Sequence, residues 1–170
     1  MDFAFPFLSW LSVLVVAGTL IAAAVSDFRT LTIPNWIPVA AAAFYVPFAY
    51  TLDITATVLG LHYGIGALLY LMGLGLVSLR IIGGGDTKLL AAISVWTGPD
   101  MTTQLLLLVA VLGGILALVT LCLRKILSGK PDGLEPRWLN PRAGTHSGIP
   151  YGIAIAMAGL ILIGQITGLK

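Results

Sequence analysis

Two aspartates, Asp27 and Asp86, stand out because each adjoins a long apolar run in a chain with few charges. Charged residues make up 9% of the 170 residues, whereas a soluble domain carries about 25%. Acids in such a setting are costly and usually functional. Two carboxyl groups brought together share a proton. The ionised one then takes a proton from water, while the protonated one polarises a carbonyl and later protonates the leaving amine. We therefore interpret Asp27 and Asp86 as one catalytic pair for peptide-bond hydrolysis.

Asp86 is preceded by Gly83, Gly84 and Gly85 and is followed two positions later by Lys88. Each glycine costs about 1 kcal/mol relative to alanine inside a helix, and glycine allows free backbone torsions and close approach of another segment. The pattern predicts a loop, whose glycines could move to admit a substrate. Two alternatives for the acids stay open: an N-cap role for Asp86 and an interfacial salt bridge for Asp27.

The ends of the expected helices suggest a division of labour within the pair. Asp86 opens a helix, where the dipole favours a carboxylate, and Asp27 closes one, where the dipole disfavours it. This makes Asp86 the base and Asp27 the initially protonated acid, as a hypothesis.

The elements that position the two acids are read from uncharged windows, since a bilayer core of about 30 Å needs about 20 apolar residues as helix. We expect the second helix to begin at Pro34 or Asn35, and the first apolar run to stay in the membrane. The prediction is an all-α fold, a polytopic six-transmembrane-helix bundle with a short fourth helix, forming one membrane-embedded domain over residues 1–170. The six windows are residues 3–26, 30–52, 54–79, 89–99, 101–123 and 143–169.

Lysine and arginine set the expected orientation. An external N-terminus places eight of the nine on the cytoplasmic side and leaves only Lys170 outside, provided that the short fourth segment crosses. A helix over residues 87–101 rises about 22 Å, so its inner end should lie below the membrane surface. There, non-helical backbone needs a recess that protein or water lines, and the glycine loop should open to the cytoplasm. The eight cations are Arg29, Arg80, Lys88, Arg124, Lys125, Lys130, Arg137 and Arg142.

Other residues bound the function further. The single cysteine, Cys122, excludes an intrachain disulfide and a cysteine-rich zinc site. We expect no metal, cofactor or nucleic-acid partner, and we interpret His62 as a packing or hydrogen-bonding residue. Glycines inside the helices are expected to allow close helix packing: Gly60, Gly64, Gly73, Gly113, Gly152 and Gly159.

At these motifs the chain resembles the type IV prepilin peptidases, which are G-x-G-D membrane aspartic proteases. The segment from Gly83 to Lys88 matches G-x-G-D-x-K, and Asp27-x-Arg29-x-x-x-Ile33-Pro34-Asn35 resembles the motif of the first aspartate. The segment Ile149-Pro150-Tyr151-Gly152 resembles the family less specifically. The resemblance implies that Asp27 and Asp86 are catalytic, and that the substrate-binding or loop residues are Gly83, Gly84, Gly85, Lys88, Pro34 and Asn35.

The resemblance also implies a substrate and a location. The substrate is a prepilin or pseudopilin, whose short basic leader is removed at the cytoplasmic face, just before its hydrophobic helix. Larger members carry a cysteine-rich insert after the first helix and also N-methylate the product. Here only a few residues join the first two windows, without Cys-x-x-Cys, so methyltransferase activity is not expected.

The compact form resembles the peptidases of Flp/Tad-type pili and, second to them, archaeal preflagellin peptidases. The expected location is the bacterial inner membrane, with several spans in the lipid bilayer. The competing classes are a small transporter or channel, which also uses glycine-interrupted segments with buried acids, and a non-catalytic scaffold of a secretion complex.

Overall fold

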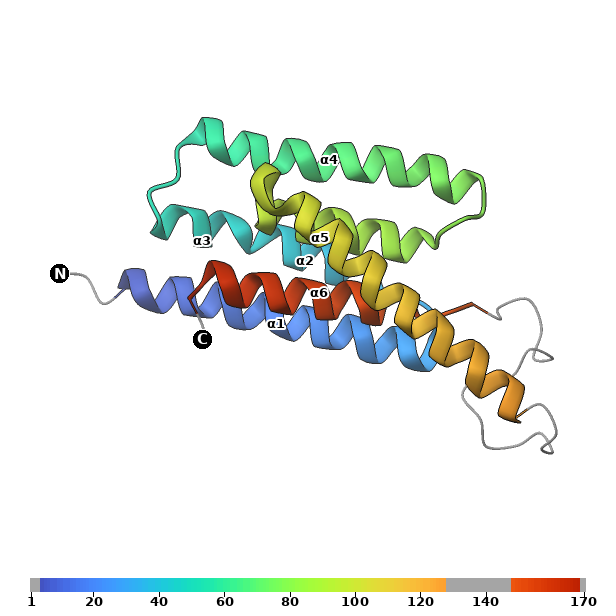
Figure 1. Ribbon diagram of the computed structural model, residues 1–170. Coiled ribbons are helices and arrows are strands. Elements are labelled where there is room, and N and C mark those ends of the chain that lie inside the picture. The colour runs from blue at the N-terminus through green and yellow to red at the C-terminus, as the bar shows by residue number, and fades with distance from the viewer. Residues whose placement is uncertain (1–3, 128–147, 169–170) are drawn as a thin grey trace.

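The computed structural model describes residues 4–127 and 148–168, and the regular structure in these ranges is entirely helical. The all-α prediction is therefore confirmed. Figure 1 shows α1 (Ala4–Thr30), α2 (Trp36–Ala43), α3 (Tyr45–Thr51), α4 (Ala56–Ser78), α5 (Gly84–Leu127) and α6 (Tyr151–Ile166).

Three of the described helices, α1, α4 and α5, are long and apolar enough to cross a membrane. Two shorter apolar stretches accompany them, at Trp36–Thr51 and Tyr151–Ile166. With the high content of hydrophobic residues, these helices indicate a membrane protein. Helix length alone does not establish the six crossings expected from the sequence.

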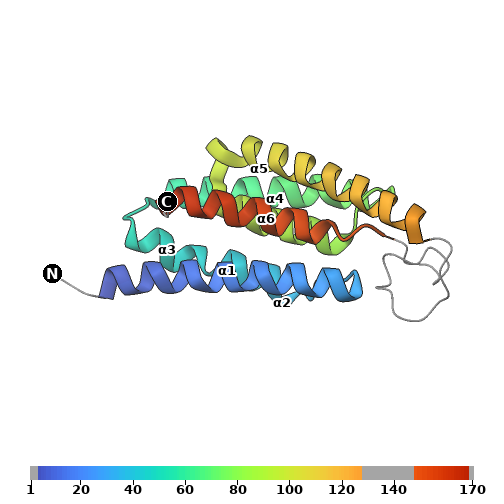
Figure 2. The same ribbon diagram turned by 60° about the horizontal axis from the view of Figure 1, so that its bottom comes forward.

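The long helix α5 is broken at Gly98, whose φ of 61° and ψ of −175° are not helical. Pro99 follows and begins the next helical stretch, a position that proline favours because it needs no amide hydrogen there. Figures 1 and 2 both show the chain turning back at this point, so that the second part of α5 returns toward the end at which α5 begins. The first part, residues 84–97, is about 20 Å long at 1.5 Å per residue. This is the short fourth helix that the sequence predicts.

A histidine supports the break. In a continuous helix the amide of Pro99 would donate to the Val95 carbonyl, but proline has no amide hydrogen. His62 Nδ1 lies 2.8 Å from this carbonyl oxygen and 2.7 Å from the hydroxyl of Tyr45. Since a carbonyl only accepts, Nδ1 carries the hydrogen and replaces the missing donor. A methyl group added at Gly98 would overlap the imidazole ring. The interpretation of His62 as a hydrogen-bonding residue is therefore confirmed.

The second window contains two helices instead of one. Pro47 lies within α3, and it lacks the amide hydrogen that would bond to the carbonyl of Ala43 in a continuous helix. The helical path is consequently interrupted at Phe44, between α2 and α3. The expected start at Pro34 or Asn35 lies within two residues of the observed first helical residue, Trp36.

The core lies where α1 packs on α2, α3 and α6, and where α5 packs on α2, α4 and α6. The helices α1 and α5 thus meet mainly through α2 and α6. The prediction of close packing at helix glycines is confirmed for four positions, where an added methyl group would crowd a neighbouring side chain, and it is wrong for Gly60 and Gly64, which have no atom within 4 Å of that position. The four are Gly73, Gly113, Gly152 and Gly159.

The three consecutive glycines do not form a loop, and this prediction is wrong for Gly84 and Gly85. The helix α5 begins at Gly84, and the amide of Thr87 donates to the carbonyl of Gly83 over 3.1 Å. A close contact explains Gly85 better than loop freedom does. A methyl group at Gly85 would lie 3.2 Å from the Cβ of Ile33. The first turn of α5 therefore contains glycines although each costs about 1 kcal/mol of helix stability relative to alanine, and this turn contacts another segment through Gly85.

Candidate active site

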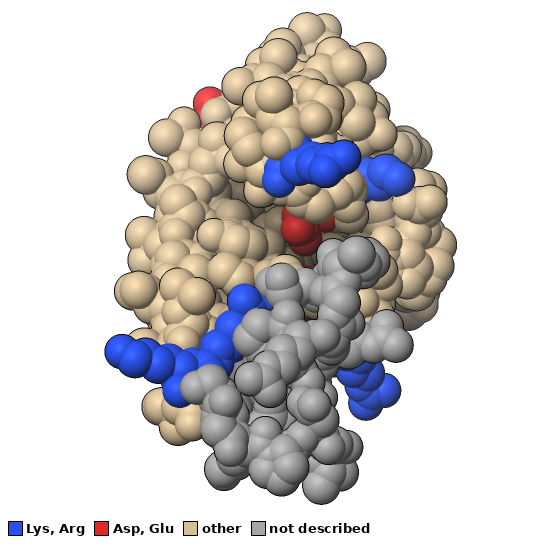
Figure 3. Space-filling model, turned by 90° about the vertical axis from the view of Figure 1, so that its right-hand side faces the viewer, with Lys and Arg blue, Asp and Glu red and all other residues tan. Residues whose placement is uncertain are grey.

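The ends of three helices converge at one end of the molecule: α1 finishes there, and α5 and α6 begin there (Figure 1). Figure 3 looks onto this end, where Lys and Arg side chains lie around a hollow that exposes acidic atoms. Among the described cations, Arg29 closes α1, while Arg124 and Lys125 fall in the last turn of α5. The predicted cytoplasmic cations Lys130, Arg137 and Arg142 lie outside the described residues, as does Lys170.

Asp27 lies one turn before the end of α1, and only 4% of its surface is exposed. Its Oδ2 accepts a hydrogen bond of 2.6 Å from the backbone amide of Gly152, in the first turn of α6. A methyl group at Gly152 would lie 2.8 Å from that same oxygen and 2.9 Å from Cδ1 of Ile33. Glycine at this position therefore allows the backbone of α6 to reach the carboxyl group directly.

Asp86 lies in the first turn of α5 and is partly buried. Its carboxyl group hydrogen-bonds back to the backbone of Gly83, as in a capping box, in which the third residue of a helix satisfies the amide that precedes it. The next residue, Thr87, is buried and contacts Gly73 of α4. Two kinds of contact therefore fix the start of α5: packing against α4 and hydrogen bonding within its own first turn.

The two carboxyl groups form one site. Asp27 and Asp86 are close enough for their charges to act on each other. Ile33 joins their surroundings, since its side chain lies against Gly152 on the side of Asp27 and against Gly85 on the side of Asp86. Ile33 is itself buried. The structure thus brings together the acids that the sequence pairs, on separate helices and with a buried apolar residue beside both.

The hypothesis that helix ends distinguish the two acids does not hold in the folded chain. Asp27 belongs to the last turns of α1, but its carboxyl group receives the amide of Gly152 at the N-terminus of α6. Both carboxyl groups therefore lie at a helix N-terminus, where the dipole favours negative charge. The helix-dipole argument no longer assigns the base to Asp86.

The remaining residues of the two motifs lie beside the acids. Lys88 Nζ donates to Oδ1 of Asn35 over 2.8 Å, which joins the start of α5 to the start of α2. The carbonyl of Pro34 accepts from the amide of Ile37, so Pro34 helps to begin α2. This arrangement places Lys88 and Asn35 at the edge of the site, whereas a contact with substrate stays a prediction for all the residues of this group.

Within residues 4–127 and 148–168, no group of three or more His, Cys, Asp or Glu side chains lies together as metal ligands would. His146 lies outside these ranges.

A family comparison now bears on this geometry. Residues 14–118 match the type IV leader peptidase family, and this range holds both acids, Ile33, Asn35 and Lys88. The chain belongs to the type IV leader peptidase family. It is therefore a protease with a leader peptidase role in general terms. Comparisons with curated proteins and with solved structures found no significant match.

Two elements of this candidate site were not found from the sequence. The first is the amide of Gly152, which lies 125 residues from Asp27 in the chain and beyond the part that matches the family. The segment Pro150-Tyr151-Gly152 pointed to this region. A backbone amide is present in almost every residue, however, so only the glycine that allows its close approach could indicate the donor. The second is Ile33, which looks like an ordinary apolar residue in sequence.

Proposed function

We propose that this leader peptidase is an aspartic endopeptidase in which Asp27 and Asp86 together hydrolyse the peptide bond. The observation that carries the proposal is the acid pair itself: two carboxyl groups, from α1 and α5, whose charges interact at the end where α6 begins. Two like charges at short range share one proton. Such a pair supplies an acid and a base from the same residue type.

The reaction follows from that shared proton. The ionised carboxyl group takes a proton from a water molecule, which attacks the carbonyl carbon of the scissile bond, while the protonated carboxyl group donates to the carbonyl oxygen. In the second half the tetrahedral intermediate collapses, and the leaving amine receives a proton from the pair. The amide of Gly152 holds one oxygen of Asp27 throughout. This leaves its other oxygen for water or substrate.

The substrate that fits is a prepilin-like protein with a short basic leader followed by an apolar helix. The family match supports this choice, and the distribution of charge supports the orientation. Arg29, Arg80 and Lys88 belong to the end of the chain's fold that holds the acid pair, whereas Asp53 and Asp100 fall at the α3–α4 and mid-α5 turns. By the positive-inside rule, we place the acid pair at the cytoplasmic side of a bacterial inner membrane, and the N-terminus outside.

The helices support six crossings as part of this proposal. The segments are α1, the pair α2 and α3, α4, the two parts of α5, and α6. Only a short connection, residues 31–35, joins α1 to α2. We therefore propose a peptidase of the compact Flp/Tad type, without N-methylation of its product.

Incubation of the purified protein in detergent with a prepilin tests the proposal. The wild type should release the leader, and Asp27→Asn and Asp86→Asn should each lower the rate by at least about 1,000-fold while the protein stays folded, because neither single carboxyl group can supply both proton transfers. Circular dichroism and thermal unfolding of each variant provide the control. Absence of cleavage by the folded wild type would support the transporter or scaffold alternatives.

A further inference from the structure

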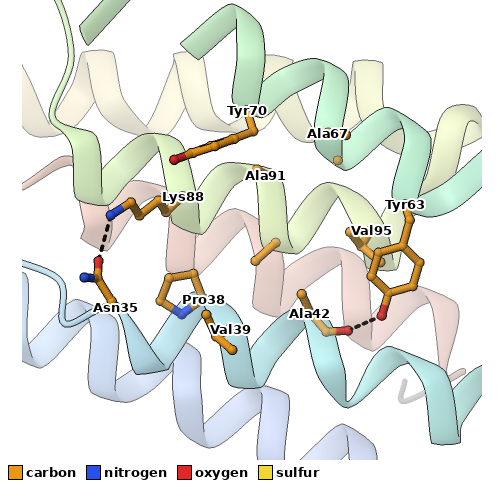
Figure 4. A pocket seen from close by; sticks show the side chains of 12 residues that line it. Asn35, Pro38, Val39, Ala42, Tyr63, Ala67, Tyr70, Lys88, Ala91 and Val95 are labelled. Atoms are coloured by element: carbon orange, nitrogen blue, oxygen red, sulfur yellow. Dashed lines mark hydrogen bonds between the residues drawn. The ribbon is translucent and has the colours of Figure 1, made fainter. Parts of the chain in front are cut away.

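An apolar groove leads away from the acid pair between α2, α4 and α5. Its volume is about 480 Å³, and Figure 4 shows that side chains of all three helices line it. We define the groove by six of its lining residues, two at each end and two along its length: Asn35, Lys88, Ala42, Tyr63, Ala67 and Val95.

The groove exists because α2 and α4 both pack on α5 but barely touch each other. The first part of α5 forms the floor, and the small residues Ala42, Gly66 and Ala67 leave room between the larger side chains of Tyr63 and Tyr70. Gly66 approaches α5 so closely that an added methyl group would lie 2.7 Å from Cγ2 of Val95. Small residues in a membrane protein allow helices to pack with close backbones. Here Ala67 and Ala42 leave room for a closely packed helix, and no helix of the described residues fills it.

At each end of the groove, a hydrogen bond joins two of the segments that line it. Near the acid pair, Lys88 Nζ donates to Oδ1 of Asn35 over 2.8 Å. At the far end, the hydroxyl of Tyr63 donates to the carbonyl of Ala42 over 2.6 Å. Both bonds are visible in Figure 4. From Asn35 to Ala42 the groove follows α2 for about 10 Å at 1.5 Å per residue. This length corresponds to two turns of a helix.

We propose that this groove binds the first turns of the apolar helix that follows the scissile bond in the substrate. The inference rests on the proposed function, since it presumes that the substrate carries such a helix. Its support is the path from the acid pair to the groove: Ile33, beside both acids, contacts Gly85, and one turn further along α5 Lys88 bonds to Asn35 at the near end of the groove. A chain cleaved between the acids and continuing into the bilayer therefore passes the bond between Lys88 and Asn35 and enters the groove.

The leader and the apolar helix are then bound in different places. The basic leader remains outside the groove, at the end where the hollow exposes acidic atoms (Figure 3), while the apolar side chains exchange lipid contacts for contacts with Ala67 and Val95. Burial of apolar surface between protein helices does not distinguish protein from lipid, so shape provides the selectivity. A groove two turns long fixes how far the scissile bond can lie from the start of the apolar helix.

Photo-crosslinking tests which molecule occupies the groove. Benzoylphenylalanine at Val39, a lining residue that is 68% exposed, in an Asp86→Asn background should cross-link to the apolar segment of a full-length prepilin in lipid nanodiscs. The matched control is the same probe at Leu61, which lies on the face of α4 opposite the groove and is 56% exposed. A substrate adduct at least about tenfold stronger at Val39 than at Leu61 supports the inference. Adducts with lipid alone, or equal substrate adducts at both positions, would overturn it.

Steady-state kinetics provides a second readout. Ala67→Trp fills the groove, and it should raise KM for the prepilin at least about tenfold while kcat changes less than about twofold, because the acids are untouched. The control is Leu68→Trp, whose residue is 51% exposed and lies away from the groove, and which should match the wild type. An unchanged KM, or an equal rise in both variants, refutes the groove. Absence of cleavage by the wild type refutes the proposed function instead, and the cross-link is measured without cleavage.

Discussion

The two ends of the molecule bury polar groups in opposite ways. At one end lies an aromatic cluster, made of Tyr45, Phe48, His62, Tyr63 and Trp96. Its donors meet backbone acceptors: the indole of Trp96 donates to the carbonyl of Ala41 over 2.7 Å, and His62 donates to the carbonyl of Val95. At the other end lies the acid pair, in which two groups of the same charge are close enough to act on each other.

This difference is the one expected between a cluster that stabilises the fold and a site that carries out a reaction. A donor matched to an acceptor in an apolar surrounding stabilises the fold, and removing one partner leaves the other unsatisfied. Two carboxyl groups at short range gain nothing from each other unless they share a proton, and that proton is available for catalysis. In the proposed mechanism the aromatic cluster therefore serves stability, whereas the acid pair serves the reaction.

After the loss of either aspartate, the largest effect is expected at the hydrogen bond between α6 and Asp27. Gly152→Ala introduces a methyl group 2.8 Å from Oδ2 of Asp27, so the carboxyl group must move. A displacement of about 1 Å in a catalytic group can cost about 100-fold in rate, and we expect a loss of this size in kcat with KM unchanged. Rates of leader cleavage and thermal unfolding measure the two consequences.

A matched control for Gly152→Ala is Gly114→Ala in α5, since no atom lies within 4 Å of an added methyl group there. This variant should cleave at the wild-type rate. Wild-type activity in Gly152→Ala would mean that α6 does not position Asp27.

An intermediate effect is expected in the aromatic cluster, on stability instead of activity. His62→Phe removes the donor for the Val95 carbonyl, and an unsatisfied buried acceptor costs about 1–3 kcal/mol. Unfolding in detergent should show this loss, while the activity per folded molecule stays near that of the wild type. Tyr45→Phe removes only a hydroxyl group and keeps the bond to Val95, so it should cost less. A lost kcat in folded His62→Phe would contradict the separation of the two ends.

The smallest effect distinguishes neighbouring glycines beside the acid pair. Gly85→Ala places a methyl group 3.2 Å from Cβ of Ile33, whereas Gly84→Ala meets nothing within 4 Å. Because Ile33 moves by only a few tenths of an ångström, we expect Gly85→Ala to slow cleavage less than about tenfold, and Gly84→Ala to stay within about twofold. Equal losses in both variants would indicate that backbone freedom, as in a hinge, matters more than contact with Ile33.

Much of the fold could be predicted from the sequence because charge and helix length constrain a membrane protein strongly. The all-helical class and the short segment before Pro99 followed from uncharged windows. The pairing of Asp27 with Asp86 followed from their rarity and from the motifs around them. These signals are local in the chain, and they depend on residue types that are expensive in an apolar setting.

The remaining features depend on contacts between distant segments. The interruption at Phe44 follows from Pro47, which is visible in sequence, but an isolated proline does not say whether a helix kinks or ends. Gly85 is helical where it packs against Ile33, and tertiary contacts of this kind override the low helix propensity of glycine. The N-terminus of α6 reaches Asp27 only in the folded chain, which is why the sequence suggested a difference between the two acids that the fold removes.

The most direct test of the central claim is the separation of the Asp27 and Asp86 carboxyl carbons in an experimental structure of the protein in a lipid nanodisc. Our account predicts a separation of no more than about 6 Å, the range over which neighbouring charges act strongly on each other, with the amide of Gly152 on Asp27. Carboxyl groups on opposite sides of the membrane, or too far apart for one water molecule to contact both, would contradict it.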